Sequence, residues 1–237
     1  MTFATLDADF EERVKEIDVF FTVLAAVENG ELSVAQNGGS LLLSAGSPPT
    51  EWGKMLKGAA YLVLYNLVEA FVRRGFQEVF EAIKGDNLSG TELRTELVQQ
   101  WIMQKNRKVS AFDGSPGVYM KIANKVVSEI MSKQHAVLNH KDLPFSGNLD
   151  AEVIRKVCVD HGITPQIDPL AKGGTALVAV VKKRNALSHG DESFSECGGQ
   201  ATIDDLLKAK TEVVLFMRSI LRNIKEFANT KSYKASP

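Results

Sequence analysis

The spacing of apolar residues is the feature that most constrains the fold of this chain. Residues 10–27 carry apolar side chains three and four positions apart, with charged residues between them, and Asn29-Gly30 follows. Residues 51–84 repeat the pattern and stop before Gly85. Because an α-helix has about 3.6 residues per turn, this spacing gathers the apolar side chains on one face. Two long amphipathic helices are predicted, the second roughly 50 Å long at about 1.5 Å per residue.

Further helices are predicted from local start signals, and the last of them runs from Thr202 to about Asn229. Ser89 and Glu92 have the spacing of a capping box, in which each residue satisfies a free backbone donor of the other. Asp150 and Thr202 each precede an apolar-periodic run and are suitable N-cap residues. Pro116 is suited to the first position of a helix.

The fold class predicted from these patterns is all-α, a helical bundle with additional helices and loops. No segment alternates apolar and polar residues convincingly as a strand would, and residues 37–49, rich in Gly, Ser and Pro, are predicted to form a loop. One domain is expected over residues 1–237, with a frayed tail after about residue 230.

Composition excludes several classes of protein. The net charge is −1, so no global basic field recruits nucleic acid. The two cysteines are not in a CxxC pair, which suits a reducing cytoplasm. We expect neither a secretory signal nor an uninterrupted apolar run of membrane-spanning length. The histidines lack metal-ligand spacing, so no metal and no cofactor are expected.

The strongest candidate for chemistry lies at the end of an apolar segment that stops at Gly190. Arg184 is a permanent cation that can donate two hydrogen bonds to phosphate oxygens, and histidine, here His189, is the side chain that most readily exchanges a proton near neutral pH. Together they suit the cutting of RNA without a metal ion. No acidic residue lies between Ala171 and His189, so the segment is a basic island. The RNA-binding candidates beside the pair are Lys182, Lys183 and Ser188.

The spacing of Arg184 and His189 is not selective by itself, because Arg155 and His161 fit the same loose pattern. On an intact helix Arg184 and His189 would also differ in direction by roughly 140°. They can converge if the helix loosens near Gly190, or if a second copy of the motif approaches across a dimer interface. Two copies would supply two histidines, one as base and one as acid, and two arginines for the charge of the transition state.

Glu69 and Asn66 interrupt the most apolar segment of the chain. A buried carboxylate is costly without a partner, so Glu69 is predicted to meet Arg184, His189 or Arg73. A purely structural pairing and an active-site role fit this observation equally well.

Five stretches of the chain resemble the HEPN superfamily, the small all-α domains of many bacterial toxins and antiviral ribonucleases. The family signature is an arginine, a polar residue and, a few residues on, a histidine; Asn185 takes the polar place. Some toxins of this family carry a modifiable tyrosine two residues after the histidine. This chain has Asp191 at that position. The resemblance favours Arg184 and His189 over Arg155 and His161. The stretches follow the stand-alone bacterial branch in order over most of the chain: residues 10–18, 62–70, 146–151, 184–190 and 193–196.

The resemblance implies a two-fold dimer with both motifs in one cleft, and metal-independent endonuclease action on RNA through its 2′-hydroxyl. His189 would be the general base or acid, and Arg184 would hold the scissile phosphate. Asn185 would position the phosphate or the histidine, and Glu69 would orient the pair. A toxin or defence effector is expected, with an antitoxin or defence-system protein as a further partner. The alternative is a non-catalytic HEPN module that binds RNA, a nucleotide or a protein, including an antitoxin-like subunit.

Overall fold

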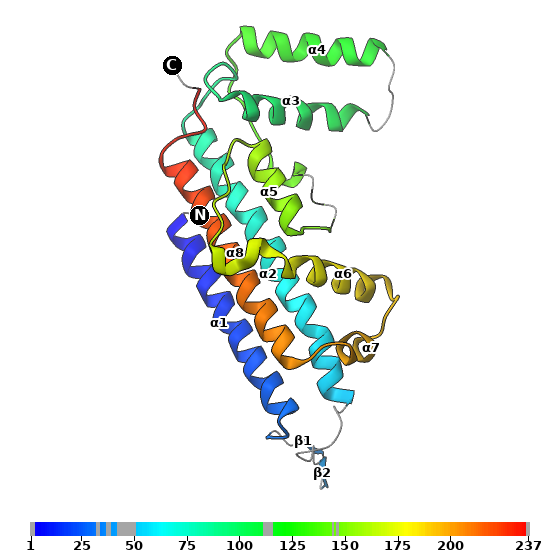
Figure 1. Ribbon diagram of the computed structural model, residues 1–237. Helices are drawn as coiled ribbons and strands as arrows, with labels where there is room; N and C mark the ends of the chain where they lie inside the picture. Colours follow the sequence, from blue (N-terminus) through cyan, green and yellow to red (C-terminus); the bar gives the residue numbers. More distant parts are fainter. Residues whose placement is uncertain are drawn as a thin grey trace.

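Three long helices form the body of the protein. The computed structural model describes residues 3–31, 34–36, 39–41, 51–110, 116–143, 145 and 147–235. Helices α1 (Phe3–Glu28), α2 (Glu51–Gly85) and α8 (Ile203–Asn229) pack against one another along their lengths (Figure 1). α1 runs antiparallel to α8, as the order of the ion pairs between them shows: Asp7 with Lys225, Glu11 with Arg218 and Asp18 with Lys210.

α2 is the central element, because it contacts α1, α6, α7 and α8. It buries residues on several sides of its axis, and one hydrophobic core runs along it. By length and composition α2 also qualifies as a membrane-spanning helix, although Asn66 and Glu69 interrupt its most apolar segment. Its apolar side chains here form the core of a helical bundle. The two predicted long helices and the all-α fold class are confirmed.

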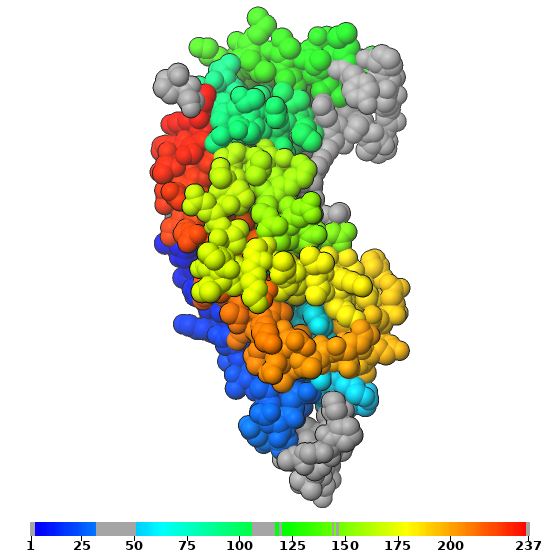
Figure 2. Space-filling view, viewed as in Figure 1, coloured from blue at the N-terminus to red at the C-terminus, as the bar shows by residue number. Residues whose placement is uncertain are grey.

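The shorter elements lie at one end and on one side of this body. α3 and α4 lie side by side at the end where α2 finishes, and α6 and α7 pack on α2 nearer its start (Figure 1). In the space-filling view the yellow and orange residues of α6 and α7 cover part of the cyan start of α2 (Figure 2). The shorter helices are α3 (Thr95–Ser110), α4 (Pro116–Met131), η1 (His140–Asp142), α5 (Ala151–Asp160), η2 (Pro169–Gly174), α6 (Ala176–His189) and α7 (Phe194–Gly199).

Most of the predicted helix starts are confirmed. The Asp150 carboxylate accepts from the Val153 N–H at 2.8 Å, and the Thr202 hydroxyl accepts from the Asp205 N–H at 3.2 Å. α4 begins at Pro116. Each cap satisfies a backbone donor that the first turn of a helix leaves free.

The capping box predicted at Ser89 is wrong as a helix start. The Ser89 N–H and hydroxyl do donate to the Glu92 carboxylate, at 2.9 and 2.6 Å. The helix nevertheless begins only at Thr95, because Leu93 forms an isolated bridge with Lys234 of the C-terminal segment. A tertiary contact therefore overrides the local signal.

Two other expectations are corrected. A short antiparallel hairpin, β1 (Val34–Gln36) and β2 (Gly39–Leu41), overlaps the predicted loop 37–49, the rest of which lies outside the described residues. The tail is not frayed as far as residue 235. Tyr233 is only 1% exposed, and its carbonyl accepts from the Arg94 N–H at 3.0 Å.

Candidate active site at the end of α6

α6 carries the predicted motif as an intact helix. Leu177, Val180 and Val181 are its buried residues, and the helix continues to His189. Gly190 then adopts φ +76°, a left-handed conformation that favours glycine, and its N–H donates to the last turn. The helix does not loosen near Gly190, which removes one of the two predicted ways to bring Arg184 and His189 together.

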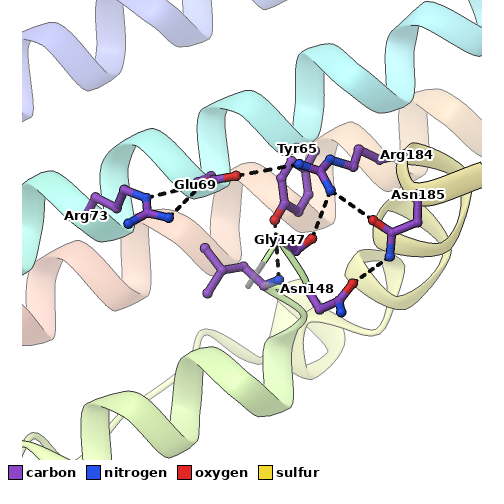
Figure 3. A network of polar contacts seen from close by, with 8 residues as sticks. Tyr65, Glu69, Arg73, Gly147, Asn148, Arg184 and Asn185 are labelled. Atoms are coloured by element: carbon purple, nitrogen blue, oxygen red, sulfur yellow. Dashed lines mark hydrogen bonds and ion pairs between the residues drawn. The ribbon is translucent and has the colours of Figure 1, made fainter. Parts of the chain in front are cut away.

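Arg184 points toward α2 and is held by four contacts (Figure 3). Its guanidinium lies over the Tyr65 ring, 4.4 Å from the centroid. Its Nη1 donates to the Gly147 carbonyl at 3.2 Å and to the Asn185 side-chain oxygen at 2.9 Å, and Glu69 supplies an ion pair. The Asn185 amide donates in turn to the Asn148 side-chain oxygen at 2.5 Å. The motif arginine and its polar neighbour therefore act as one preorganised unit.

Glu69 meets two of its three predicted partners. Its Oε1 accepts from Arg73 at 2.9 and 3.2 Å, and its Oε2 lies 4.0 Å from Nη2 of Arg184. No contact with His189 is observed within the described residues. The Glu69 side chain is 28% exposed, so it is not the buried carboxylate that the apolar sequence suggested. Water covers part of the group and reduces the cost of its charge.

An open depression runs along this face of α2. Its volume is about 360 Å³. Burial raises the pKa of the Tyr65 hydroxyl, which therefore stays neutral and is unsuited to act as a base near neutral pH. The depression is lined by Leu62, Tyr65, Asn66, Glu69, Ala70, Arg73 and Arg184.

The remaining predicted site residues lie apart from this unit. His189, Lys182 and Ser188 are exposed. Lys183 is instead tied to the segment that leads into and out of α7, at 2.9 Å from the Glu192 carboxylate and 2.5 Å from the Gln200 side chain. The structure thus brings Arg184, Asn185 and Glu69 together. It leaves His189 on the open surface and gives Lys183 a structural contact.

The competing pair, Arg155 and His161, is structural. His161 is 1% exposed, and its ring lies 4.8 Å from that of Phe76 and 5.8 Å from that of Phe80. Burial lowers its pKa from 6.5 to about 4, so it is neutral at physiological pH. Arg155 donates to a backbone carbonyl of η2 at 2.6 Å. His161 is therefore closed to a substrate, and Arg155, which is partly exposed, has no accessible histidine beside it in this pair.

Sequence reasoning gave no role to several residues of the site. Tyr65, Gly147 and Asn148 lie in stretches that resemble the family, but nothing local marks them as partners of Arg184. Arg73 was predicted only as a partner for Glu69. The described residues contain no group of three or more His, Cys, Asp or Glu that could hold a metal ion. Independence of metals stays a prediction.

An all-α bundle that presents an arginine, a polar residue and a histidine at a helix end defines a class of nuclease-associated helical domains. A profile of one such family, HEPN_MAE_28990-like HEPN, matches residues 3–233. Because the match covers nearly the whole chain, this protein belongs to the HEPN superfamily. Comparisons with curated proteins and with solved structures found no match.

Proposed function

We propose that this protein is a metal-independent endoribonuclease whose cleavage site is built from two copies of the chain. Three things support the proposal: membership of a nuclease-associated family, the preorganised Arg184–Asn185 unit, and the exposure of His189. A role as a cytoplasmic toxin or antiviral defence effector, restrained by a partner protein, is the biological setting that we propose on the family resemblance.

The observation that carries the proposal is the intact C-terminal end of α6. Arg184 is held against α2, while His189, five residues on, is exposed and points roughly 140° away. One chain therefore does not assemble both groups around a phosphate. A two-fold axis near the end of α6 would bring the arginine and histidine of two motifs into one cleft.

In this mechanism the RNA 2′-hydroxyl attacks the adjacent phosphorus. One His189 takes the hydroxyl proton, and the His189 of the other copy protonates the 5′-oxygen as its bond to phosphorus breaks. Arg184 binds the non-bridging oxygens and offsets their charge, which is greatest in the transition state. Asn185 fixes the direction of Arg184. The products are a 2′,3′-cyclic phosphate and a free 5′-hydroxyl.

The test is cleavage of total RNA and of a single-stranded oligonucleotide in EDTA. His189→Ala and Arg184→Ala should each reduce the rate by about 100-fold or more, because each removes a proton carrier or a charge-stabilising donor. Matched controls are His140→Ala, a partly exposed histidine outside the motif, and Arg74→Ala, an arginine paired with Asp9 on the α1 side of α2. Both controls should keep the wild-type rate.

Two results would contradict the mechanism: activity that requires a divalent metal, or activity that survives both substitutions. RNA binding without any cleavage would instead support the non-catalytic module. Expression in cells separates the two classes again, because a ribonuclease slows growth only when Arg184 and His189 are intact.

A further inference from the structure

We propose that Arg73 and Arg184 together form a phosphate site for the RNA backbone, and that Glu69 is the anion that occupies it until RNA arrives. The inference rests on the proposed function, in which Arg184 holds the scissile phosphate. It adds Arg73 as a second phosphate-binding residue. It also gives Glu69 a second role, as a competitor of the substrate.

The geometry of the three side chains carries the inference. Glu69 lies between the two arginines, and each of its oxygens faces one of them: Oε1 faces Arg73 at 2.9 Å and Oε2 faces Arg184 at 4.0 Å (Figure 3). A guanidinium binds carboxylate and phosphate oxygens through the same planar fork. The carboxylate of Glu69 therefore takes the position that a phosphate bridging both arginines would take.

Both arginines are fixed by contacts that do not depend on Glu69. The Arg184 guanidinium lies over Tyr65, and the Arg73 guanidinium lies over Phe145, 4.9 Å from the ring centroid. The Gly147 carbonyl holds Arg184 as well. Since these contacts order the side chains in the free protein, binding a phosphate does not cost the entropy of ordering them.

The site is also accessible and has donors to spare. The side chains of Arg73 and Arg184 are 32% and 26% exposed at the open depression, whose volume of about 360 Å³ leaves room for a phosphate and its sugar. Each guanidinium carries five N–H donors, of which the protein contacts use only some. The exposed side chain of Asn66 lines the same depression and can meet the sugar.

The neighbouring Arg74 offers a matched comparison. It lies on the same helix, its side chain is 28% exposed, and it too stacks on a ring and pairs with a carboxylate, here Phe71 and Asp9. It faces α1, however, and does not line the depression that holds Arg184. Removing Arg74 changes the net charge as removing Arg73 does, but it leaves the proposed site intact.

The experiment measures binding of a single-stranded oligonucleotide with 2′-O-methyl groups, which cannot be cut by 2′-hydroxyl attack. Arg73→Ala should weaken binding about tenfold, as expected for one charged hydrogen-bonding group. The slope of log affinity against log salt should fall by about 0.7, as expected for one lost phosphate contact on a single strand. Arg73→Lys keeps the charge but loses the planar set of donors, so its affinity should lie between those of the wild type and Arg73→Ala. Arg74→Ala should bind as the wild type does.

Glu69→Gln should tighten binding several-fold, because the amide keeps the shape of the side chain but no longer neutralises the two arginines. Weaker binding in Glu69→Gln would overturn the competitor role, since Glu69 would then serve only to position the arginines. Wild-type affinity and salt slope in a folded Arg73→Ala, or no binding of the oligonucleotide by the wild type, would overturn the whole site. Thermal melting verifies that each variant is folded, and Arg73→Lys replaces Arg73→Ala if the latter unfolds.

This experiment is independent of cleavage. If the binding results hold but unmodified RNA is not cut in EDTA, the phosphate site stands and the ribonuclease proposal fails. If RNA is cut but Arg73 and Glu69 have no effect on binding, only the phosphate site fails.

Discussion

Two histidines of this chain illustrate how burial decides the role of a side chain. His161 lies in the core, where its Nδ1 donates to the Val157 carbonyl at 2.7 Å. Its Nε2 is buried and has no hydrogen-bond partner in the described part of the chain, so a proton there would be a buried charge without an acceptor. His189 is exposed at the C-terminal end of α6. Only His189 is free to exchange protons with a substrate.

Burial of His161 predicts a specific loss of stability in acid. Its pKa is about 4 in the folded protein against 6.5 when unfolded, so between these values only the unfolded chain binds the proton. Above pH 6.5 the titration of His161 costs no stability. As the pH falls to about 4, the free energy of unfolding decreases by roughly 3 kcal/mol. Urea unfolding at several pH values between 7 and 4 measures this cost.

His161→Gln is the control for this prediction. A glutamine does not titrate, so the free energy of unfolding of this variant should depend less on pH over the same window. An equal pH dependence in both proteins would mean that other groups cause the acid sensitivity.

The site residues show what sequence can and cannot predict at this scale. Arg184, Asn185 and His189 are marked by their order along the chain, and Glu69 by its charge within an apolar helix. Tyr65 and Phe145 look like ordinary core aromatics, because their stacking on Arg184 and Arg73 arises only when distant segments meet. The simultaneous pairing of Glu69 with Arg73 and Arg184 was not predicted either, because Arg184 is distant from Glu69 in the sequence.

At the scale of elements, local signals predict the long helices but not α7. α1, α2 and α8 each span many turns, so their apolar period is clear, and Asp150 and Thr202 cap helices by contacts within a few residues. α7 has only six residues, too few to display a period. Its position depends on close approach to α2, where a Cβ on Gly58 would lie 2.5 Å from the Phe194 carbonyl oxygen.

The α2–α7 contact predicts that Gly58→Ala is destabilising. The added methyl group would meet backbone of α7, which cannot move aside as a flexible side chain can, so we expect a loss of about 1–3 kcal/mol. Chemical denaturation of Gly58→Ala and Gly85→Ala measures the difference. Gly85 lies at the end of the same helix with no atom near its would-be Cβ, so its substitution should be neutral or slightly stabilising. Equal effects at the two positions would contradict the close packing of α7.

At the scale of the whole molecule, the C-terminal segment closes one end of the bundle. Tyr233 packs on Phe227 and donates to Asp86 at 3.0 Å, and Lys231 and Lys234 pair with the same carboxylate. These contacts lower the pKa of Asp86, led by the hydrogen bond from Lys231. The segment thereby joins the end of α8 to the end of α2. A short polar tail gives no periodic signal, which is why the sequence suggested fraying.

Truncation after Thr230 should therefore lower the melting temperature. The loss of Tyr233, a fully buried aromatic residue, costs about 3–5 kcal/mol by comparison with large-to-small core substitutions. Truncation after Ala235 removes only the last two residues and is the control. If both truncated proteins melt at the wild-type temperature, the segment does not contribute to the fold.

The central claim concerns two molecules, because each cleavage event is proposed to use the His189 of both copies. Subunit poisoning tests it: His189→Ala is added in threefold excess to a fixed amount of wild-type protein, subunits are allowed to exchange, and RNA cleavage in EDTA is measured. Activity should fall to about a quarter, the fraction of wild-type chains still paired with a wild-type partner in a two-fold dimer. An excess of Arg74→Ala should leave the rate undiminished. Unchanged activity in the presence of demonstrated mixed dimers would contradict the shared site.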